Sequence, residues 1–267
     1  MPDWDNPSFQ PALRRAVLNG EGKMDWSLLW LAGLGLFVAG VVKGATGLGY
    51  SSCALPFLVS ALGLKPAMAL VLIPAMATNV TVAFTAGHFV ETWRRFANLY
   101  VAMLPGIAVG VYLLMWIAQA LAVKTLGLIV IAYAAMTLVR PQVLISKFAE
   151  RGLQVPTGFA NGVLTGLTGS QVMPLFPYMM SLDLDPSRLV QAINLAVTVA
   201  SVFLAVGLIY AGIMTPELIG VSILAIVPAL VGTQLGTRLR SHIPASQFRS
   251  VVLYVLLATG FLLLVRT

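Results

Sequence analysis

The feature that most constrains this chain is a series of long runs without any charged side chain. A helix that crosses a bilayer needs about 20 mostly apolar residues. The runs are too long and too evenly apolar for the short alternating strands of a membrane barrel. The sequence therefore predicts an all-α, polytopic integral membrane protein. The runs without Asp, Glu, Lys, Arg or His are 66–87, 96–123, 152–182, 189–216 and 218–237.

Composition excludes several other classes of protein. Only 9% of the 267 residues are charged and 59% are hydrophobic, whereas a soluble domain carries roughly 25% charged residues. The net charge of +7 does not indicate nucleic-acid binding, because most Lys and Arg lie between the apolar runs, where they anchor and orient spans. One Cys and two His disfavour a zinc centre. We expect no metal, no cofactor and no nucleic-acid partner.

Matching landmarks indicate that the chain contains the same unit twice. Each landmark recurs after about 120 to 126 residues: Gly40–Gly47 at Gly162–Gly169, Leu64–Pro66 at Leu184–Pro186, and Gly106–Gly110 at Gly232–Gly236. Internal duplication is common in transporters, where the substrate lies at the midplane between the repeats. The predicted organisation is an N-terminal tail with a short amphipathic stretch (1–27), a first membrane repeat (28–140), a charged linker (141–153) and a second membrane repeat (154–267).

Each predicted half opens with a hydrophobic segment that glycines interrupt. In the first half the break is Gly44–Gly49; in the second it is Gly166–Gly169, with Pro174 and Pro177 after it. Irregular backbone at membrane depth is tolerated where it lines a cavity or is packed in protein. We expect a helix that breaks and resumes, either crossing once or folding back as a re-entrant segment. The alternative is that these glycines only let helices pack closely.

Three plain spans should follow each broken segment. The sequence predicts them at 66–87, 97–117, 120–139, 188–212, 217–238 and 246–265. Gly106/Gly110 and Gly232/Gly236 have the GxxxG spacing of helix-packing faces. Basic residues close to span ends favour re-entrant segments, inverted halves and an N-terminus outside the cell.

Lys43 is the one ionisable residue that lies deep in an apolar segment. Charge inside a membrane is costly and by default marks function. A lysine there would attract an anion or exchange a proton during transport. The alternative is that its side chain snorkels to the membrane surface.

The residues after each break predict new half-helices, at Tyr50 and at Ser170. A helix N-terminus offers free N–H groups and the positive end of a dipole, so two such ends would form a symmetric anion cradle. Hydroxyls that bond to their own helix, and asparagines that join two helices, are the alternatives. The predicted substrate-binding residues are Lys43, Gly44, Thr46, Gly47, Gly49, Tyr50, Ser51, Ser52, Asn79, Thr168, Gly169, Ser170, Gln171 and Asn194.

The sequence lacks the catalytic motifs of several common enzyme classes. The stretch Gly49–Cys53 lacks the final glycine of a nucleophile elbow, and neither an HExxH motif nor a P-loop occurs. We expect a protein that is not an enzyme.

With the breaks and the repeat in place, residues 28–267 resemble the sulfite exporter TauE/SafE family of bacterial membrane transporters. That resemblance implies a multi-pass protein of the bacterial inner membrane that moves sulfite, sulfonates or related small anions. Gly44, Gly47, Gly49, Gly166 and Gly169 carry over by motif. The chain departs from the family's further glycines at Tyr50 and at Ser170–Val172, which should affect the choice of substrate. The shared positions are Gly40–Gly49, Pro56, Gly162–Gly169, Pro105, Gly106, Gly110, Pro228, Gly232 and Gly236.

The expected function is a secondary transporter, an exporter by resemblance, of a small anion such as sulfite or an organosulfonate. An anion channel and a transporter of a carboxylate or other small organic anion are the alternatives. The expected partners are a small anionic substrate and membrane lipid, and self-association into a homo-oligomer stays open.

Overall fold

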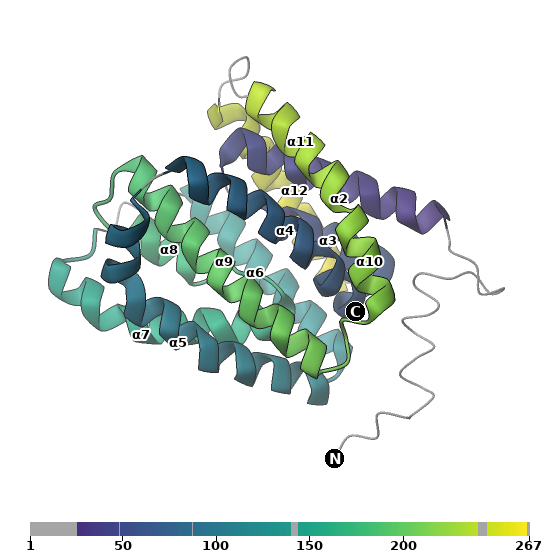
Figure 1. Cartoon of the computed structure of the whole chain (residues 1–267), viewed down its shortest axis with the longest axis horizontal. Helices are drawn as coiled ribbons and strands as arrows, with labels where there is room; N and C mark the ends of the chain where they lie inside the picture. The colour runs from purple at the N-terminus through teal and green to yellow at the C-terminus, as the bar shows by residue number, and fades with distance from the viewer. Residues whose placement is uncertain (1–25, 48, 87, 140–143, 240–244, 266–267) are drawn as a thin grey trace.

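The structure, a computed structural model of the chain, is built from α-helices (Figure 1). It describes residues 26–47, 49–86, 88–139, 144–239 and 245–265, and the regular elements in these ranges are all helical, which confirms the all-α class. Residues 1–25, most of the predicted tail, lie outside them. The helices are α2 (Trp26–Thr46), α3 (Tyr50–Leu62), α4 (Leu64–Ala86), α5 (Phe89–Trp116), α6 (Gln119–Val139), α7 (Lys147–Thr168), α8 (Leu175–Met180), α9 (Pro186–Tyr210), α10 (Pro216–Leu224), α11 (Ile226–Leu239) and α12 (Ala245–Val265).

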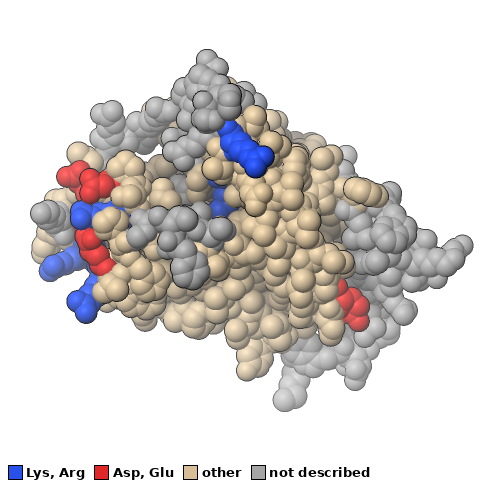
Figure 2. Space-filling model, turned by 45° about the horizontal axis from the view of Figure 1, so that its top comes forward, with Lys and Arg blue, Asp and Glu red and all other residues tan. Residues whose placement is uncertain are grey.

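Several of these helices are long and apolar enough to cross a membrane. By length and composition, four described stretches qualify: Phe89–Trp116, Gln119–Val139, Pro186–Tyr210 and Pro216–Leu239. Shorter apolar helices accompany them at Ala32–Ala45, Tyr50–Leu62, Leu64–Val80 and Val252–Val265. Figure 2 shows a face whose charged side chains gather mostly at one end, with a long uncharged surface beside them. This distribution is that of an integral membrane protein.

The predicted plain spans are confirmed as helices, and one of them is divided. We expected a single helix over 217–238, but α10 ends at Leu224 and α11 begins at Ile226. The cause is Pro228, whose ring clashes with the carbonyl of the residue four positions earlier, Leu224, and which has no N–H to donate to it.

Helix α7 also begins earlier than expected, at Lys147, inside the segment predicted as a linker. Ser146 caps it, because its hydroxyl accepts a hydrogen bond from Ala149 N at 3.3 Å. Farther along, Arg95 of α5 donates to both carboxylate oxygens of Glu150, at 2.7 and 2.9 Å. This ion pair fixes the start of α7 against α5.

The first helix of each predicted half packs against the other half. Helix α2 packs along α11, and α7 packs along α5 (Figure 1). Small residues allow both approaches: Gly40 and Gly44 lie against the α11 backbone at Ala229–Thr237, and Gly162 and Gly166 against the α5 backbone at Met103–Val111. Two related halves would make this reciprocal pattern, although the repeat itself stays a prediction.

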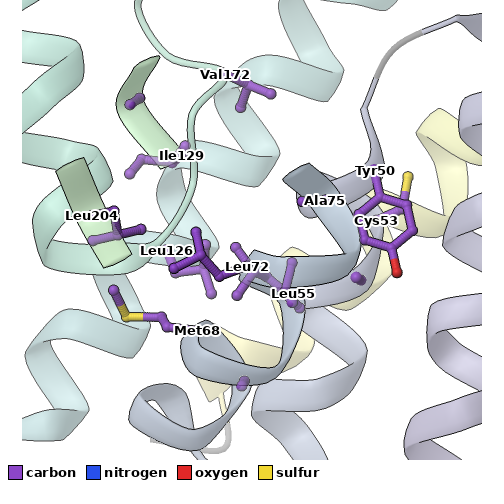
Figure 3. Close-up of a cluster of buried hydrophobic side chains, with 14 of the residues drawn as sticks. Tyr50, Cys53, Leu55, Met68, Leu72, Ala75, Leu126, Ile129, Val172 and Leu204 are labelled. Carbon is purple, nitrogen blue, oxygen red and sulfur yellow. The ribbon is translucent and has the colours of Figure 1, made fainter. Parts of the chain in front are cut away.

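A cluster of apolar side chains holds α3 in place at the centre of the molecule (Figure 3). Leu55 of α3 lies beside Leu72 of α4, with Leu126 of α6 next to them, and Met68 of α4 and Leu204 of α9 belong to the same cluster. All of these side chains are buried. The packing matters for function because it fixes where the N-terminus of α3 lies.

Candidate anion-binding site

The first helix break lies between α2, which ends at Thr46, and α3, which begins at Tyr50. Gly47 has φ +82° and Gly49 has φ +89°, in the left-handed region that a Cβ disfavours. A Cβ at either position would meet no atom within 4 Å. These two glycines therefore serve the backbone conformation of the break and not helix packing.

The second break differs from the expectation. Helix α7 ends at Thr168 and Gly169 has φ +75°, but the chain stays non-helical until α8 begins at Leu175. The prediction of a half-helix starting at Ser170 is wrong, and with it the symmetric pair of helix N-termini. The reason is Pro174: it biases Met173 away from helical geometry and would clash with the carbonyl of Ser170 in a helix.

Side chains of α7 hold this non-helical segment instead. Asn161 Nδ2 donates to the carbonyl oxygens of Gln171 at 3.2 Å and Met173 at 2.9 Å. Thr165 Oγ1 donates to the carbonyl of Ser170 at 3.3 Å. On its other side, Gln171 Nε2 donates to Ser201 Oγ of α9 at 3.0 Å. The backbone and the side chain of Gln171 are thus both fixed.

A cavity lies where the two breaks approach each other. It offers a volume of about 30 Å³ to the centres of water-sized molecules, and about 10 to 15 Å³ measured in this way accommodates one water. The cavity therefore has room for about two waters or one small polyatomic ion. Its lining consists of Lys43, Gly47, Gly49, Tyr50, Ser51, Ser52, Ala75, Asn79, Gln171, Val172, Phe176, Ile193, Asn194 and Val197.

Lys43 reaches this cavity from the last turn of α2. Its side chain is 3% exposed, which argues against snorkelling to the surface. Nζ donates to Thr78 Oγ1 at 3.0 Å and to Asn79 Oδ1, both on α4. Both acceptors are neutral, and within the described part of the chain Lys43 forms no ion pair with a carboxylate. The positive charge therefore has only dipoles around it.

The N-terminus of α3 forms the neighbouring wall. Gly49 is its N-cap and supplies no side-chain hydrogen bond, and the first bond across it runs from Cys53 N to Gly49 O at 3.1 Å. The N–H groups of Tyr50, Ser51 and Ser52 precede that bond, so the helix gives them no acceptor. All three residues line the cavity. Lysine and helix end together form a site suited to an anion.

Most of the predicted site residues come together here. Asn194 lines the cavity and also joins two helices, since its Nδ2 donates to Asn79 O at 2.9 Å. Thr168 does not line it: its hydroxyl donates to Leu164 O at 2.6 Å, as the helix-bonding alternative expected. Gly44 lies outside it as well, because its Cα faces the backbone of Thr233.

The remaining predicted positions lie beside the cavity or cannot be placed. Gly169 faces Met68 and Leu55. Ser170 is buried, and its hydroxyl has no hydrogen-bond partner among the residues that the structure describes. The side chain of Thr46 lies outside the described part of the structure.

Sequence reasoning missed the apolar part of the lining. Ala75 lies about one helical turn before Asn79 and Val197 about one turn after Asn194, so periodicity around the asparagines could have found these two residues. Ile193 directly precedes Asn194 and is not indicated in this way. Phe176 has no comparable signal. Nothing in the sequence distinguishes Asn161 from other polar residues within apolar segments, although it anchors the second break.

Replacing Asn161 by alanine should lower the unfolding temperature of the purified protein and weaken anion binding. It would leave two buried carbonyls unpaired, at a cost of about 1–3 kcal/mol each, and release the backbone of Gln171. Thermal unfolding and calorimetric titration with sulfite measure the two effects. Asn98→Ala, at an exposed position of α5, is the matched control; equal behaviour of the two variants would contradict the anchoring role.

No curated protein and no solved structure matches the chain. The sequence model of the sulfite exporter TauE/SafE family matches residues 21–263, nearly the whole chain. This match includes both glycine breaks and every helix that lines the cavity. The chain belongs to the sulfite exporter TauE/SafE family.

Proposed function

We propose that this protein is a secondary transporter that exports a small anion, such as sulfite or an organosulfonate, across the bacterial inner membrane. Membership of the family supports transport of this kind. The observation that carries the choice of an anion is Lys43, buried in a cavity beside the free N–H groups of α3.

The energetics of that lysine favour an anionic guest. A buried charge is costly unless a counter-charge or many hydrogen bonds compensate it. Thr78 and Asn79 supply neutral oxygens only. An anion between Nζ and the first turn of α3 would neutralise the lysine and accept hydrogen bonds from the N–H groups of that turn. A cation in the same cavity would be repelled.

The position of the cavity supports a transport role. Helices α2, α3 and α4 line it from the first predicted repeat, and α8, α9 and the segment before α8 line it from the second. Transporters with internal repeats commonly bind substrate at such a junction, near the bilayer midplane, and rock one part against another to expose it on alternate sides. We propose the same arrangement here.

Counterflow in proteoliposomes tests this proposal. Labelled sulfite should enter vesicles faster when unlabelled sulfite or methanesulfonate is present inside, because a carrier returns more quickly when loaded. A conductive, voltage-driven flux without such acceleration would identify an anion channel. Faster counterflow with acetate than with any sulfur oxyanion would identify a carboxylate transporter, and no flux with any of these anions would refute transport by this site.

A further inference from the structure

The cavity carries a single charge and a free hydrogen-bond acceptor, and together these select among the forms of the substrate. Resting on the proposed function, we infer that the species bound is the protonated monovalent anion hydrogensulfite and not the divalent sulfite ion. Two separate observations on the lining of the cavity lead to this assignment.

The first observation is the charge of the lining. Lys43 from α2 and Tyr50 from α3 are its titratable side chains, while the lining residues from α4, α8, α9 and the segment 171–172 are uncharged. The N-terminus of α3 adds N–H donors and a partial positive charge, but no second full charge. One lysine neutralises a monovalent anion. A divalent anion would leave one negative charge without a counter-charge in a buried site, which is costly.

The second observation is the amide of Gln171. Its side chain is 3% exposed, and its Nε2 is committed to Ser201 Oγ at 3.0 Å. Its Oε1 has no hydrogen-bond partner among the described residues, although Gln171 lines the cavity. An amide oxygen repels an ionised oxyanion oxygen but accepts a hydrogen bond from an S–OH group. An unpaired buried acceptor therefore favours a guest that brings its own hydrogen.

Other residues of the lining supply the donors that the ionised oxygens need. Asn79 Oδ1 accepts from Lys43, and the Nδ2 of the same amide has no partner in the described part of the chain. Lys43 Nζ, Asn79 Nδ2 and the first N–H groups of α3 can thus donate to deprotonated oxygens, while Gln171 Oε1 accepts from the protonated one. Hydrogensulfite can accept hydrogen bonds from these donors and donate one to Gln171 Oε1. Sulfite and sulfate can accept from the donors but have no hydrogen to donate to Gln171.

Titration of the wild-type protein in nanodiscs at a series of pH values tests this assignment. If only hydrogensulfite binds, the apparent Kd for total sulfite rises about tenfold for each pH unit above the second pKa of sulfurous acid. Methanesulfonate is monovalent throughout and has a methyl group in place of the hydroxyl. Its Kd should stay constant over the same range, which controls for titration of Lys43 or Tyr50, and sulfate should not bind measurably.

A variant isolates the contribution of the acceptor. Hydrogensulfite should bind the wild type at least about tenfold more tightly than methanesulfonate, as one hydrogen bond to a buried acceptor allows. In Gln171→Leu this ratio should fall toward one, while in Gln234→Leu, at an exposed glutamine of α11, it should persist. Sulfite affinity that does not fall as the dianion forms would overturn this inference and leave the proposed function intact. Absence of binding by every sulfur oxyanion at every pH would overturn the proposed function itself.

Discussion

Replacing Lys43 by methionine is expected to weaken sulfite binding about a hundredfold, the upper end of what a hydrogen bond to a charged group contributes. Methionine keeps an unbranched side chain of similar length but removes the one basic side chain among the described lining residues. The guest would lose both its counter-charge and a donor. Calorimetric titration of the purified protein measures the change.

Two controls separate lost binding from lost folding. Lys124 is an exposed lysine of α6, so Lys124→Met should bind sulfite as the wild type does. Removing a buried charge that has no ionic partner should leave the unfolding temperature of Lys43→Met unchanged or raise it. A Kd for Lys43→Met equal to that of the wild type would remove this lysine from the site.

The part of the site that the sequence predicts well is the part with unusual chemistry. Lys43, Gly47, Gly49 and Tyr50 follow one another within a single break, and a charge or a cluster of glycines in an apolar segment is conspicuous. The apolar residues of the lining are not conspicuous in the sequence. Phe176 resembles any other buried aromatic residue until the fold places it beside the cavity. Sequence can show where a site needs polarity, but the closing of its walls depends on tertiary packing.

The second break shows a further limit. Its glycines match those of the first break, so the sequence predicted the same helix start after both. Pro174 and Pro177 override this similarity, and Asn161 supplies the hydrogen bonds that a helix would otherwise have made. The two breaks therefore contribute differently to the site, one through backbone N–H groups and the other through the amide of Gln171.

For the fold, hydropathy located the helices, and the GxxxG spacing indicated that some of them pack closely. The GxxxG spacing did not indicate which helices pack against each other. A small-residue face lets any helix approach, and its partner is fixed only by the complementary face and by contacts such as Arg95–Glu150. The pairing of α2 with α11 and of α5 with α7 therefore emerges only from the structure.

That pairing leads to a large expected effect at a residue outside the lining of the cavity. Replacing Gly166 by alanine should destabilise the protein by about 1–3 kcal/mol or more, because the added methyl would overlap the Ile107 carbonyl and lie 2.7 Å from Val111 N on α5. Gly152 lies on the same helix with no atom within 4 Å of a Cβ. Gly152→Ala should be neutral or stabilise by up to about 1 kcal/mol through helix propensity.

Thermal unfolding in one detergent compares the two variants, and equal unfolding temperatures would refute close α5–α7 packing as a source of stability. Helix α7 also carries Asn161, which lies between Gly166 and the start of that helix and holds the backbone of Gln171. A methyl that pushes α7 away from α5 should therefore displace Gln171 as well. Gly166→Ala should weaken sulfite binding even in the molecules that remain folded, whereas Gly152→Ala should not, because no contact between α7 and α5 changes in that variant.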